Sequence, residues 1–275
     1  MTGRYLMGLG VGGGGGRCLL VNAATGGTVS VFRVWTLPLD PPAGGFAFKL
    51  DTDAVWRVLG ETAQEALKQA GISPQEVVGV AATSMRHSLA AIDKKGKVLL
   101  ATPNRDSRAV DQGMGLAMER GEEIYQMTGH APNPIFMAAR LMWLKDNRPD
   151  DFKSAYAALS ISDWVGYMLT GELASEPAQA AESLLFDLRS RKWAGALIKS
   201  MGIPEKILPS LKQAGSKLGK LTKQAAVNLG LPPGILVAVG GPDTQCGLLG
   251  AGVVSPGQIG VIAGTTTPVQ MAVDR

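Results

Sequence analysis

The chain has 275 residues, of which 45% are hydrophobic, 18% are charged and 36 are glycines, a composition typical of a globular α/β protein with one large or two smaller domains. The net charge is only +4 and aromatic residues make up 5%, which argues against a nucleic-acid surface. No apolar run approaches the ~20 residues of a membrane span and no signal core follows the N-terminus, so we expect a cytoplasmic protein with no nucleic-acid or membrane partner.

The N-terminal region predicts three short strands separated by glycine-rich turns. The expected strands are 5–9, 17–21 and 29–35, and the expected turns are 12–16 and 23–27. Short turns join antiparallel neighbours, so the chain is predicted to open as a three-stranded antiparallel meander. Asp51 or Thr52 is then expected to cap a helix whose apolar residues recur at helical spacing until Gly71.

Beyond this first helix, strand and helix patterns alternate. A continuous apolar run at 77–82 predicts a buried parallel strand, and a hairpin at 89–92 and 98–100 follows it. The further expected elements are helices at 107–128, 136–146, 163–169, 193–201 and 222–229 and strands at 155–161 and 235–240. Ser162 is expected to cap the third of these helices, and 204–219 to be a surface excursion. The predicted fold class is α/β, with a mixed sheet and helices on both faces.

A run of glycines at 8–16 contains the pattern GxGxxG in more than one register. The dinucleotide fingerprint requires a helix directly after the glycines, whereas residues 17–21 predict a strand. An oxidoreductase that binds NAD is therefore the weakest interpretation. The run is either a plain hairpin turn or a phosphate site, because bare backbone lets several N–H groups approach one anion.

Few side chains are available for nucleophilic or metal chemistry. Cys18 and Cys246 are far apart and lack a CxxC or His/Cys ligand set, so two reduced thiols are predicted, without a disulfide or a zinc site. His87 and His130 are the only histidines. His130 follows Gly129 at a predicted helix end and is interpreted as a loop residue.

Asp243 directly follows the last predicted buried strand, and a glycine-hydroxyl segment, Gly264-Thr265-Thr266-Thr267, comes after it. A carboxylate at a strand end can accept the proton of an attacking hydroxyl, and such a loop can hold a phosphate. The alternatives are that Asp243 caps a helix starting at Thr244 and that the glycine segment is an ordinary hairpin turn.

Several segments follow one another in a fixed order along nearly the whole chain. They are the opening glycine hairpin, Ser84-Met85-Arg86-His87, Asn104-Arg105-Asp106-Ser107-Arg108, Arg140-Leu141-Met142-Trp143-Leu144, Ile161-Ser162-Asp163-Trp164, Leu184-Leu185-Phe186-Asp187-Leu188 and Gly240-Gly241-Pro242-Asp243. In this order they resemble the first half of the FGGY family of carbohydrate kinases, whose fold is shared with actin, hexokinase and the Hsp70 ATPase. The Ser-Met-Arg, Asp-x-Arg and Ser-Asp-Trp segments are most similar to those of autoinducer-2 kinases, with xylulokinases next. The resemblance implies an actin-like ATPase or ribonuclease H-like lobe.

The resemblance also implies ATP-dependent phosphorylation of a small sugar or polyol, with ATP and Mg²⁺ as cofactors. It places the catalytic base, in indirect contact with Mg²⁺, on Asp243. It implies substrate contacts for Met85, Arg86, His87, Asp106, Arg108 and Asp243, and cofactor contacts for Gly12, Gly13, Gly14, Arg17, Gly264, Thr265 and Thr266. A structural ion pair between Asp106 and Arg108 is an equal alternative, and an isolated loop histidine usually has no functional role.

Two positions of the first strand depart from the family pattern. The family has Asp-x-Gly-Thr there, with the Asp organising Mg²⁺ and the Thr helping to hold phosphate, whereas this chain has Gly10 and Gly13. The missing carboxylate and hydroxyl are expected to impair activity.

The chain is also shorter than members of the family, which are nearly twice as long. We expect 1–243 to be the N-terminal, sugar-binding lobe and 244–275 to be the start of the C-terminal lobe, with an interdomain helix and a hairpin at 258–263 and 268–273. This hairpin has no sheet to join and is expected to seek a partner, in a homodimer or in a separate chain that carries the second lobe. The isolated chain is expected to bind sugar with weak or no turnover, and the alternative is a non-catalytic sugar-binding or regulatory relative.

Overall fold

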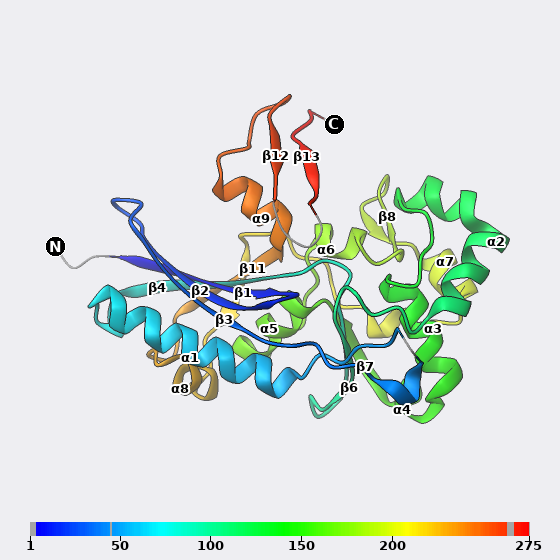
Figure 1. The fold of residues 1–275 in the computed structure, drawn as a ribbon, viewed down its shortest axis with the longest axis horizontal. Helices are drawn as coiled ribbons and strands as arrows, with labels where there is room; N and C mark the ends of the chain where they lie inside the picture. Colours follow the sequence, from blue (N-terminus) through cyan, green and yellow to red (C-terminus); the bar gives the residue numbers. More distant parts are fainter. Residues whose placement is uncertain (1–3, 45, 263–266, 275) are drawn as a thin grey trace.

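The computed structural model describes residues 4–44, 46–262 and 267–274. Its main sheet has the strand order β10-β11-β4-β1-β2-β3. The strands are β1 (Tyr5–Gly12), β2 (Gly15–Asn22), β3 (Thr28–Val34), β4 (Val77–Ser84), β10 (Lys217–Lys220) and β11 (Leu236–Pro242). β1, β2 and β3 pair in antiparallel fashion, while β4 pairs in parallel with both β1 and β11. The predicted meander is confirmed as one half of a mixed sheet (Figure 1).

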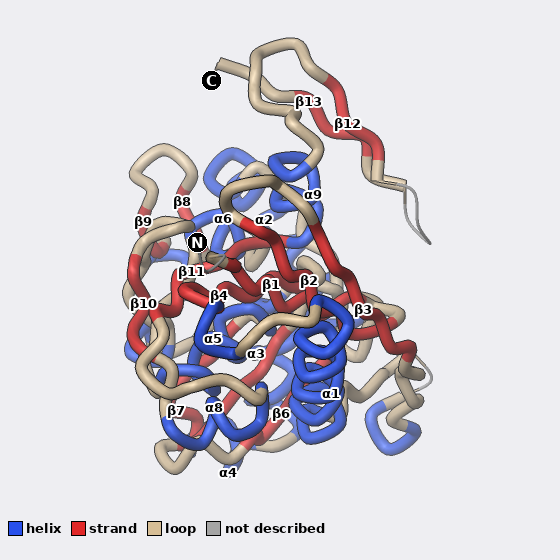
Figure 2. The backbone as a smooth tube through the Cα atoms, turned by 90° about the vertical axis from the view of Figure 1, so that its left-hand side faces the viewer, coloured by secondary structure: helices blue, strands red, loops and turns tan. Residues whose placement is uncertain are grey.

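Helices lie on both faces of this sheet, unevenly. One face carries α1 (Thr52–Ala70), α5 (Ile161–Thr170) and α8 (Lys223–Leu229), and the other carries α9 (Asp243–Gly250), as Figures 1 and 2 show. On the first face Met7, Leu9 and Val11 of β1 are at most 2% exposed, whereas Leu6 on the α9 face is 48% exposed. The main core therefore lies between the sheet and α1, α5 and α8. Among the helices that the structure describes, none is long and apolar enough to cross a membrane.

Capping residues explain where α1 and α5 begin and end. Asp51 Oδ1 accepts a backbone N–H of the first turn of α1 at 2.9 Å, and Gly71 ends the helix with a left-handed φ of 63° that glycine adopts without strain. In α5 the cap is Ser160, whose Oγ accepts a first-turn N–H at 3.2 Å. The prediction of Ser162 as the cap was wrong, because a serine caps equally well two positions earlier.

A second layer surrounds the smaller sheet β6-β5-β7, which consists of β5 (Leu89–Asp93), β6 (Val98–Thr102) and β7 (Ala155–Leu159). The helices of this layer are α2 (Val110–Thr128), α3 (Met137–Asn147), α4 (Pro149–Ser154) and α7 (Gly195–Ser200), while α6 (Pro177–Ala181) contacts both β8 and the main-sheet strand β11. Short pieces complete the layer: β8 (Phe186–Asp187), β9 (Lys192–Trp193) and the 3₁₀ turns Pro41–Ala43 and Glu205–Ile207, while a further 3₁₀ turn, Pro74–Glu76, joins α1 to β4 of the main sheet. The layer has its own hydrophobic core, which includes Ile124, Leu141 and Leu197.

The segment 204–219 is only in part the surface excursion that was predicted. Ile207 and Leu208 are buried, at 1% and 7% exposed, and Leu218 of β10 is buried in the main core. β10 pairs with β11 as the edge strand of the main sheet. The prediction was wrong here because a four-residue strand with lysines at both ends carries almost no alternating pattern.

The end of β11 departs from regular pairing. Its register against β4 shifts just before Gly241, and Thr83 Oγ1 donates to the Gly241 carbonyl at 2.8 Å. A side chain on Gly240 would place its Cβ 1.5 Å from the carbonyl oxygen of Ala82, so only glycine permits this approach. This bulge sets the direction in which the chain leaves the sheet toward Asp243.

The predicted C-terminal hairpin is confirmed in the part of the chain that the structure describes. β12 (Ile259–Val261) and β13 (Val269–Met271) pair with each other in antiparallel fashion, as a two-stranded sheet of their own. The hairpin projects beyond α9, away from the main sheet (Figure 1).

Candidate active site

Two parallel strands bring the candidate residues to one edge of the main sheet. β4 ends at Ser84, which pairs with Pro242 at the end of β11. Arg86 and His87 follow β4, and Asp243 follows β11, so these segments leave the sheet side by side. Ligands of α/β sheets collect at the carboxyl ends of parallel strands. The structure thus brings together the predicted base and two of the predicted substrate-binding residues.

Asp243 is the first residue of α9 and is partly buried. Its Oδ1 accepts the backbone N–H of Thr244 at 2.8 Å. The helix starts at Asp243 itself, with Pro242 as its N-cap residue and no side-chain cap, so the capping alternative was wrong. Burial raises the pKa of Asp243, and the negative charge of Glu182 adds to this rise, while the Thr244 hydrogen bond and the positive charge of Arg86 act against it. A raised pKa strengthens a carboxylate as a proton acceptor.

Both histidines of the chain lie around Glu182, a residue that the sequence analysis missed. Arg86 Nη1 lies 3.3 Å from Glu182 Oε1, and the Nε2 atoms of His87 and His130 lie 3.4 and 3.7 Å from Glu182 Oε2. Phe136 packs edge-on against the His87 ring, with the ring centroids 4.8 Å apart. The only sequence signal for Glu182 was its place just before the Leu-Leu-Phe-Asp-Leu segment, because its contact with Arg86 spans 96 positions.

Asp106 and Arg108 form a buried ion pair with each other. Arg108 Nε lies 3.0 Å from both carboxylate oxygens of Asp106, and both side chains are 0% exposed. Arg108 Nη1 lies 3.2 Å from Asp40 and Arg140 Nε lies 3.3 Å from Asp106. Arg140 Nη1 also donates to the His87 carbonyl at 2.6 Å, so this network supports the loop of the candidate site. That is the geometry of the ion-pair alternative, and substrate contact by Asp106 and Arg108 stays a prediction.

Met85 anchors the start of the same loop. Its side chain is 1% exposed and belongs to the main core. Its backbone N–H donates to the Val11 carbonyl at 2.8 Å, which ties the loop to the end of β1. Substrate contact by Met85 stays a prediction.

The turn between β1 and β2 is built from Gly13 and Gly14, and a strand follows it. The helix that a dinucleotide fingerprint needs is absent here, as the sequence pattern predicted. A Cβ on Gly14 would have no neighbour within 4 Å, and on Gly13 its nearest neighbour would be Asn104 Oδ1 at 3.4 Å. Arg17 Nη1 donates to Ser30 Oγ of β3 at 3.0 Å. Cofactor contacts by Arg17 and by Gly12 to Gly14 stay predictions.

The position of the family's first-strand carboxylate, Gly10, has room for a side chain. A Cβ there would lie 3.7 Å from Arg17 Cβ and 3.8 Å from Thr83 Cγ2, which are ordinary contacts. Within the described residues, no group of three or more His, Cys, Asp and Glu side chains could hold a metal ion. The bare turn fits a phosphate. Mg²⁺ in such sites is held by only one or two carboxylates together with substrate phosphates, so indirect Mg²⁺ contact by Asp243 stays a prediction. The predicted loop residues Gly264, Thr265 and Thr266 lie outside the described residues.

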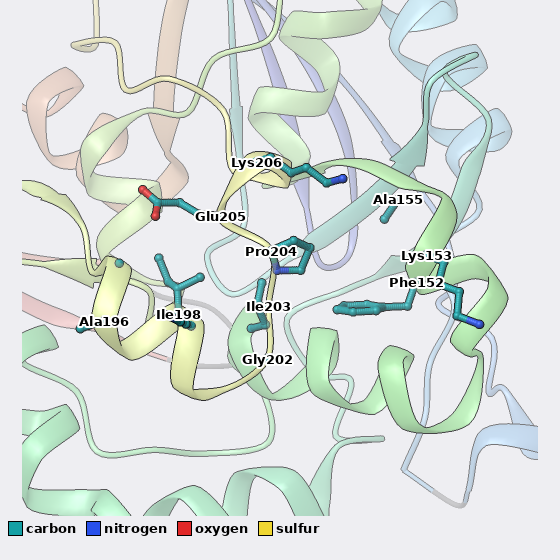
Figure 3. A pocket seen from close by; sticks show the side chains of 12 residues that line it. Phe152, Lys153, Ala155, Ala196, Ile198, Gly202, Ile203, Pro204, Glu205 and Lys206 are labelled. Atoms are coloured by element: carbon teal, nitrogen blue, oxygen red, sulfur yellow. The ribbon is translucent and has the colours of Figure 1, made fainter.

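A hollow of about 870 Å³ lies elsewhere in the molecule, between α4, α7 and the loop that follows α7 (Figure 3). Its lining includes Phe152, Ile198, Ile203 and Pro204, with Lys206 at its edge. None of its lining residues is a predicted site residue, so it takes no part in the chemistry considered for Asp243.

A mixed sheet that opens with an antiparallel meander and ends in a strand-end carboxylate is the architecture of actin-like ATPase lobes, and solved sugar kinases share it. A xylulose kinase from Rhodospirillum rubrum matches with a TM-score of 0.88 at 24% identity, covering 97% of this chain and 55% of that one. A gluconate kinase from Lactobacillus acidophilus matches with a TM-score of 0.87 at 19% identity, covering 98% of this chain and 54% of that one. The predicted fold class is confirmed.

The chain belongs to the FGGY family of carbohydrate kinases, because the model of that family's N-terminal domain matches residues 5–250. The autoinducer-2 kinase of Escherichia coli (strain K12) is 35% identical over 265 residues, and that of Yersinia enterocolitica is 36% identical over 269 residues. These matches cover 95% and 96% of this chain and 50% of each relative. The chain therefore spans half the length of the curated relatives that it matches.

Proposed function

We propose that the chain is the sugar-binding lobe of a cytoplasmic, ATP-dependent kinase that phosphorylates a hydroxyl of a sugar or polyol, as autoinducer-2 kinases or xylulose kinases do. The observation that carries the proposal is the meeting of Asp243, Arg86 and His87 at the ends of the neighbouring parallel strands β4 and β11. Residues 1–243 form this lobe in the proposal, and 244–275 begin the second lobe.

In this proposal Asp243 is the general base. Its carboxylate takes the proton of the attacking hydroxyl, while Arg86 and His87 hold neighbouring hydroxyls and so orient the attacking one. Burial raises the pKa of Asp243, which makes this proton transfer more favourable above that pKa, where the group is ionised. ATP supplies the phosphoryl group when it is bound, and the backbone N–H groups around Gly13 and Gly14 are the part of this chain that would hold its phosphates.

The same proposal includes impaired activity. Gly10 and Gly13 lack the carboxylate and the hydroxyl that the family uses for Mg²⁺ and phosphate. A Cβ at Gly10 meets only ordinary contacts, so Gly10→Asp is expected to fold. Because the metal carries much of the charge neutralisation in phosphoryl transfer, we expect this change to raise activity.

The test is phosphoryl transfer from Mg²⁺-ATP to D-xylulose, xylitol, glycerol and autoinducer-2. It is measured with the chain alone and with a polypeptide carrying the second lobe of a family member. We expect weak or no turnover alone, turnover with the second lobe, and a further increase in Gly10→Asp. Asp243→Asn should remove the turnover. If the Gly10→Asp chain together with the second lobe transfers no phosphate to any of these acceptors, the kinase proposal is wrong.

A second candidate function is a non-catalytic, sugar-binding or regulatory relative of these kinases. The observation that favours it is the pair of glycines at 10 and 13, which removes two groups used for catalysis but none at the β4 and β11 edge. It predicts sugar binding that does not change when Mg²⁺-ATP is added. Calorimetry decides between the two, because ATP-dependent tightening of sugar binding argues for the kinase.

A further inference from the structure

The Glu182 cluster, which consists of Glu182, Arg86, His87, His130 and Phe136, contains an acceptor without a donor. Glu182 Oε1 is paired with Arg86 Nη1 at 3.3 Å. Glu182 Oε2 is buried and accepts no hydrogen bond from the described residues, although both histidine Nε2 atoms lie nearby. The Glu182 side chain is only 8% exposed. A buried carboxylate oxygen without a donor is unfavourable and marks a place where a ligand or another group supplies one.

A neutral His87 ring can donate to only one of the two Glu182 oxygens that it faces. Its Nδ1 lies 3.4 Å from the Glu182 carbonyl oxygen, and its Nε2 lies 3.4 Å from Glu182 Oε2. A neutral imidazole carries one N–H, so one of the two oxygens always faces a nitrogen lone pair. Burial lowers the pKa of His87 to about 4, although the charge of Glu182 opposes this. At neutral pH the pair therefore lacks one proton donor.

The backbone on both sides of the cluster is strained. His87 has φ 52° and Leu184, two residues after Glu182, has φ 63°, values in the left-handed region that non-glycine residues rarely adopt. Such strain persists only where surrounding contacts impose it, and it concentrates at ligand sites. Arg140 and Phe136 provide such contacts for His87, through a hydrogen bond to its carbonyl and through ring packing. The cluster is thus held in place before any ligand arrives.

The charges around the cluster favour an uncharged ligand. Arg86 acts electrostatically on Asp243 and is paired with Glu182, so one guanidinium faces two carboxylates. The two carboxylates therefore outnumber the guanidinium that they share. A carboxylate on a ligand would be repelled there, whereas a hydroxyl can donate to an oxygen.

We propose that Glu182 determines substrate specificity at this site. Its Oε2 accepts a hydrogen bond from a hydroxyl of an uncharged sugar or polyol, and its charge disfavours sugar acids. The hydroxyl approaches on the side of His130, whose side chain is 33% exposed. This inference rests on the proposed function, because it names the substrate class of the same site.

The test is calorimetric titration of the chain with D-xylulose, xylitol, glycerol and D-gluconate. We expect at least one uncharged ligand to bind about tenfold or more tighter than gluconate. Glu182→Gln keeps the shape but loses the charge-assisted hydrogen bond, so it should weaken the uncharged ligand by about tenfold or more and reduce its preference over gluconate. Glu172→Gln, which alters an exposed carboxyl, is the matched control and should leave both affinities unchanged.

A second measurement uses the wild-type chain alone, so it does not depend on the folding of a variant. The chain has only two histidines, so its proton NMR spectrum has two imidazole Hε1 signals. A saturating uncharged ligand should shift both signals, whereas gluconate at the same concentration should shift neither.

The outcomes separate this inference from the proposed function. Three results would each overturn the role of Glu182 and leave the kinase proposal standing. They are unchanged affinities in Glu182→Gln, gluconate binding as tight as that of the uncharged ligands, and histidine signals that stay in place. Selective binding of uncharged sugars without phosphoryl transfer in any combination of lobes would overturn the kinase proposal alone. If none of the four ligands binds, the role of Glu182 is wrong, and the kinase proposal is decided by the phosphoryl-transfer assay, which also includes autoinducer-2.

Discussion

At the scale of single residues, Asp163 links the stability of the fold to pH. It lies in the first turn of α5 and is 9% exposed, and its Oδ1 accepts the backbone N–H of Glu176 at 3.3 Å. Burial raises the pKa of Asp163 to about 7, against the hydrogen bonds that it accepts from Ser160, Glu176 and Ser175. Because the pKa is higher in the folded state, its protonated form contributes stability that is fully present below about pH 4 and lost as the pH rises through about 7.

We therefore expect Asp163→Asn to stabilise the chain at high pH. Asparagine stays uncharged and keeps an oxygen for the Glu176 N–H. The variant should exceed the parent in free energy of unfolding by something on the order of 1–3 kcal/mol at pH 8, with little difference near pH 4. Urea unfolding at pH 4, 6 and 8 measures this. Asp150→Asn, at a carboxyl that is 99% exposed, should show no such trend, and a variant less stable than the parent at pH 8 would contradict the argument.

The same scale shows what the sequence could and could not predict at the site. Asp243 was predictable, because a lone acid after a continuous apolar run is a strong local signal. The contact between Asp106 and Arg108 was predictable as one of two alternatives, because the two residues are close in sequence. Glu182 was not predictable, since its place in the site depends on contacts with His87 and His130, which lie on two other loops. Local patterns place residues on elements, whereas side-chain burial and pairing depend on which loops the topology brings together.

At the scale of elements, the long helices and buried strands, and the short helices α7 and α8, follow from capping residues and hydrophobic periodicity, whereas β10 and the short helices α4 and α6 do not. These short elements are held by neighbours and carry little pattern of their own. The bulge at Gly240 is of this kind. The carbonyl oxygen of Ala82 lies so close to Gly240 that no side chain fits there. No feature of the Val-Gly-Gly-Pro segment alone distinguishes Gly240 from Gly241.

Gly240→Ala is expected to separate β11 from β4 and so to disturb Asp243. A methyl group 1.5 Å from the Ala82 oxygen forces a backbone shift, and we expect a loss of at least about 3 kcal/mol of stability, at the upper end of single-residue effects. Thermal and urea unfolding measure the loss. The control is Gly121→Ala in α2, where a Cβ meets nothing within 4 Å, and this change should be neutral or stabilising. Equal stability of the two variants would contradict the importance of the bulge.

At the scale of the whole molecule, the C-terminal hairpin presents an uncovered apolar face. In its register Ile259 pairs with Met271 and Val261 with Val269, so all four side chains lie on one face. They are 55–66% exposed. A two-stranded hairpin with such a face and unpaired edges is a template for association. This is the physical basis for expecting a second copy or a second lobe as the partner.

We therefore expect the chain to self-associate through this hairpin as its concentration rises. The double change Val261→Lys and Val269→Glu places opposite charges on a directly paired position, which should preserve the hairpin while making its face polar. Sedimentation velocity over a hundredfold range of concentration should show that the parent associates and that the variant stays monomeric. The two proteins should unfold at the same temperature. Val227→Lys, at an apolar residue of α8 that is 80% exposed, serves as the control and should associate like the parent. A parent chain that stays monomeric throughout, or a variant that associates as strongly, would place the partner surface elsewhere.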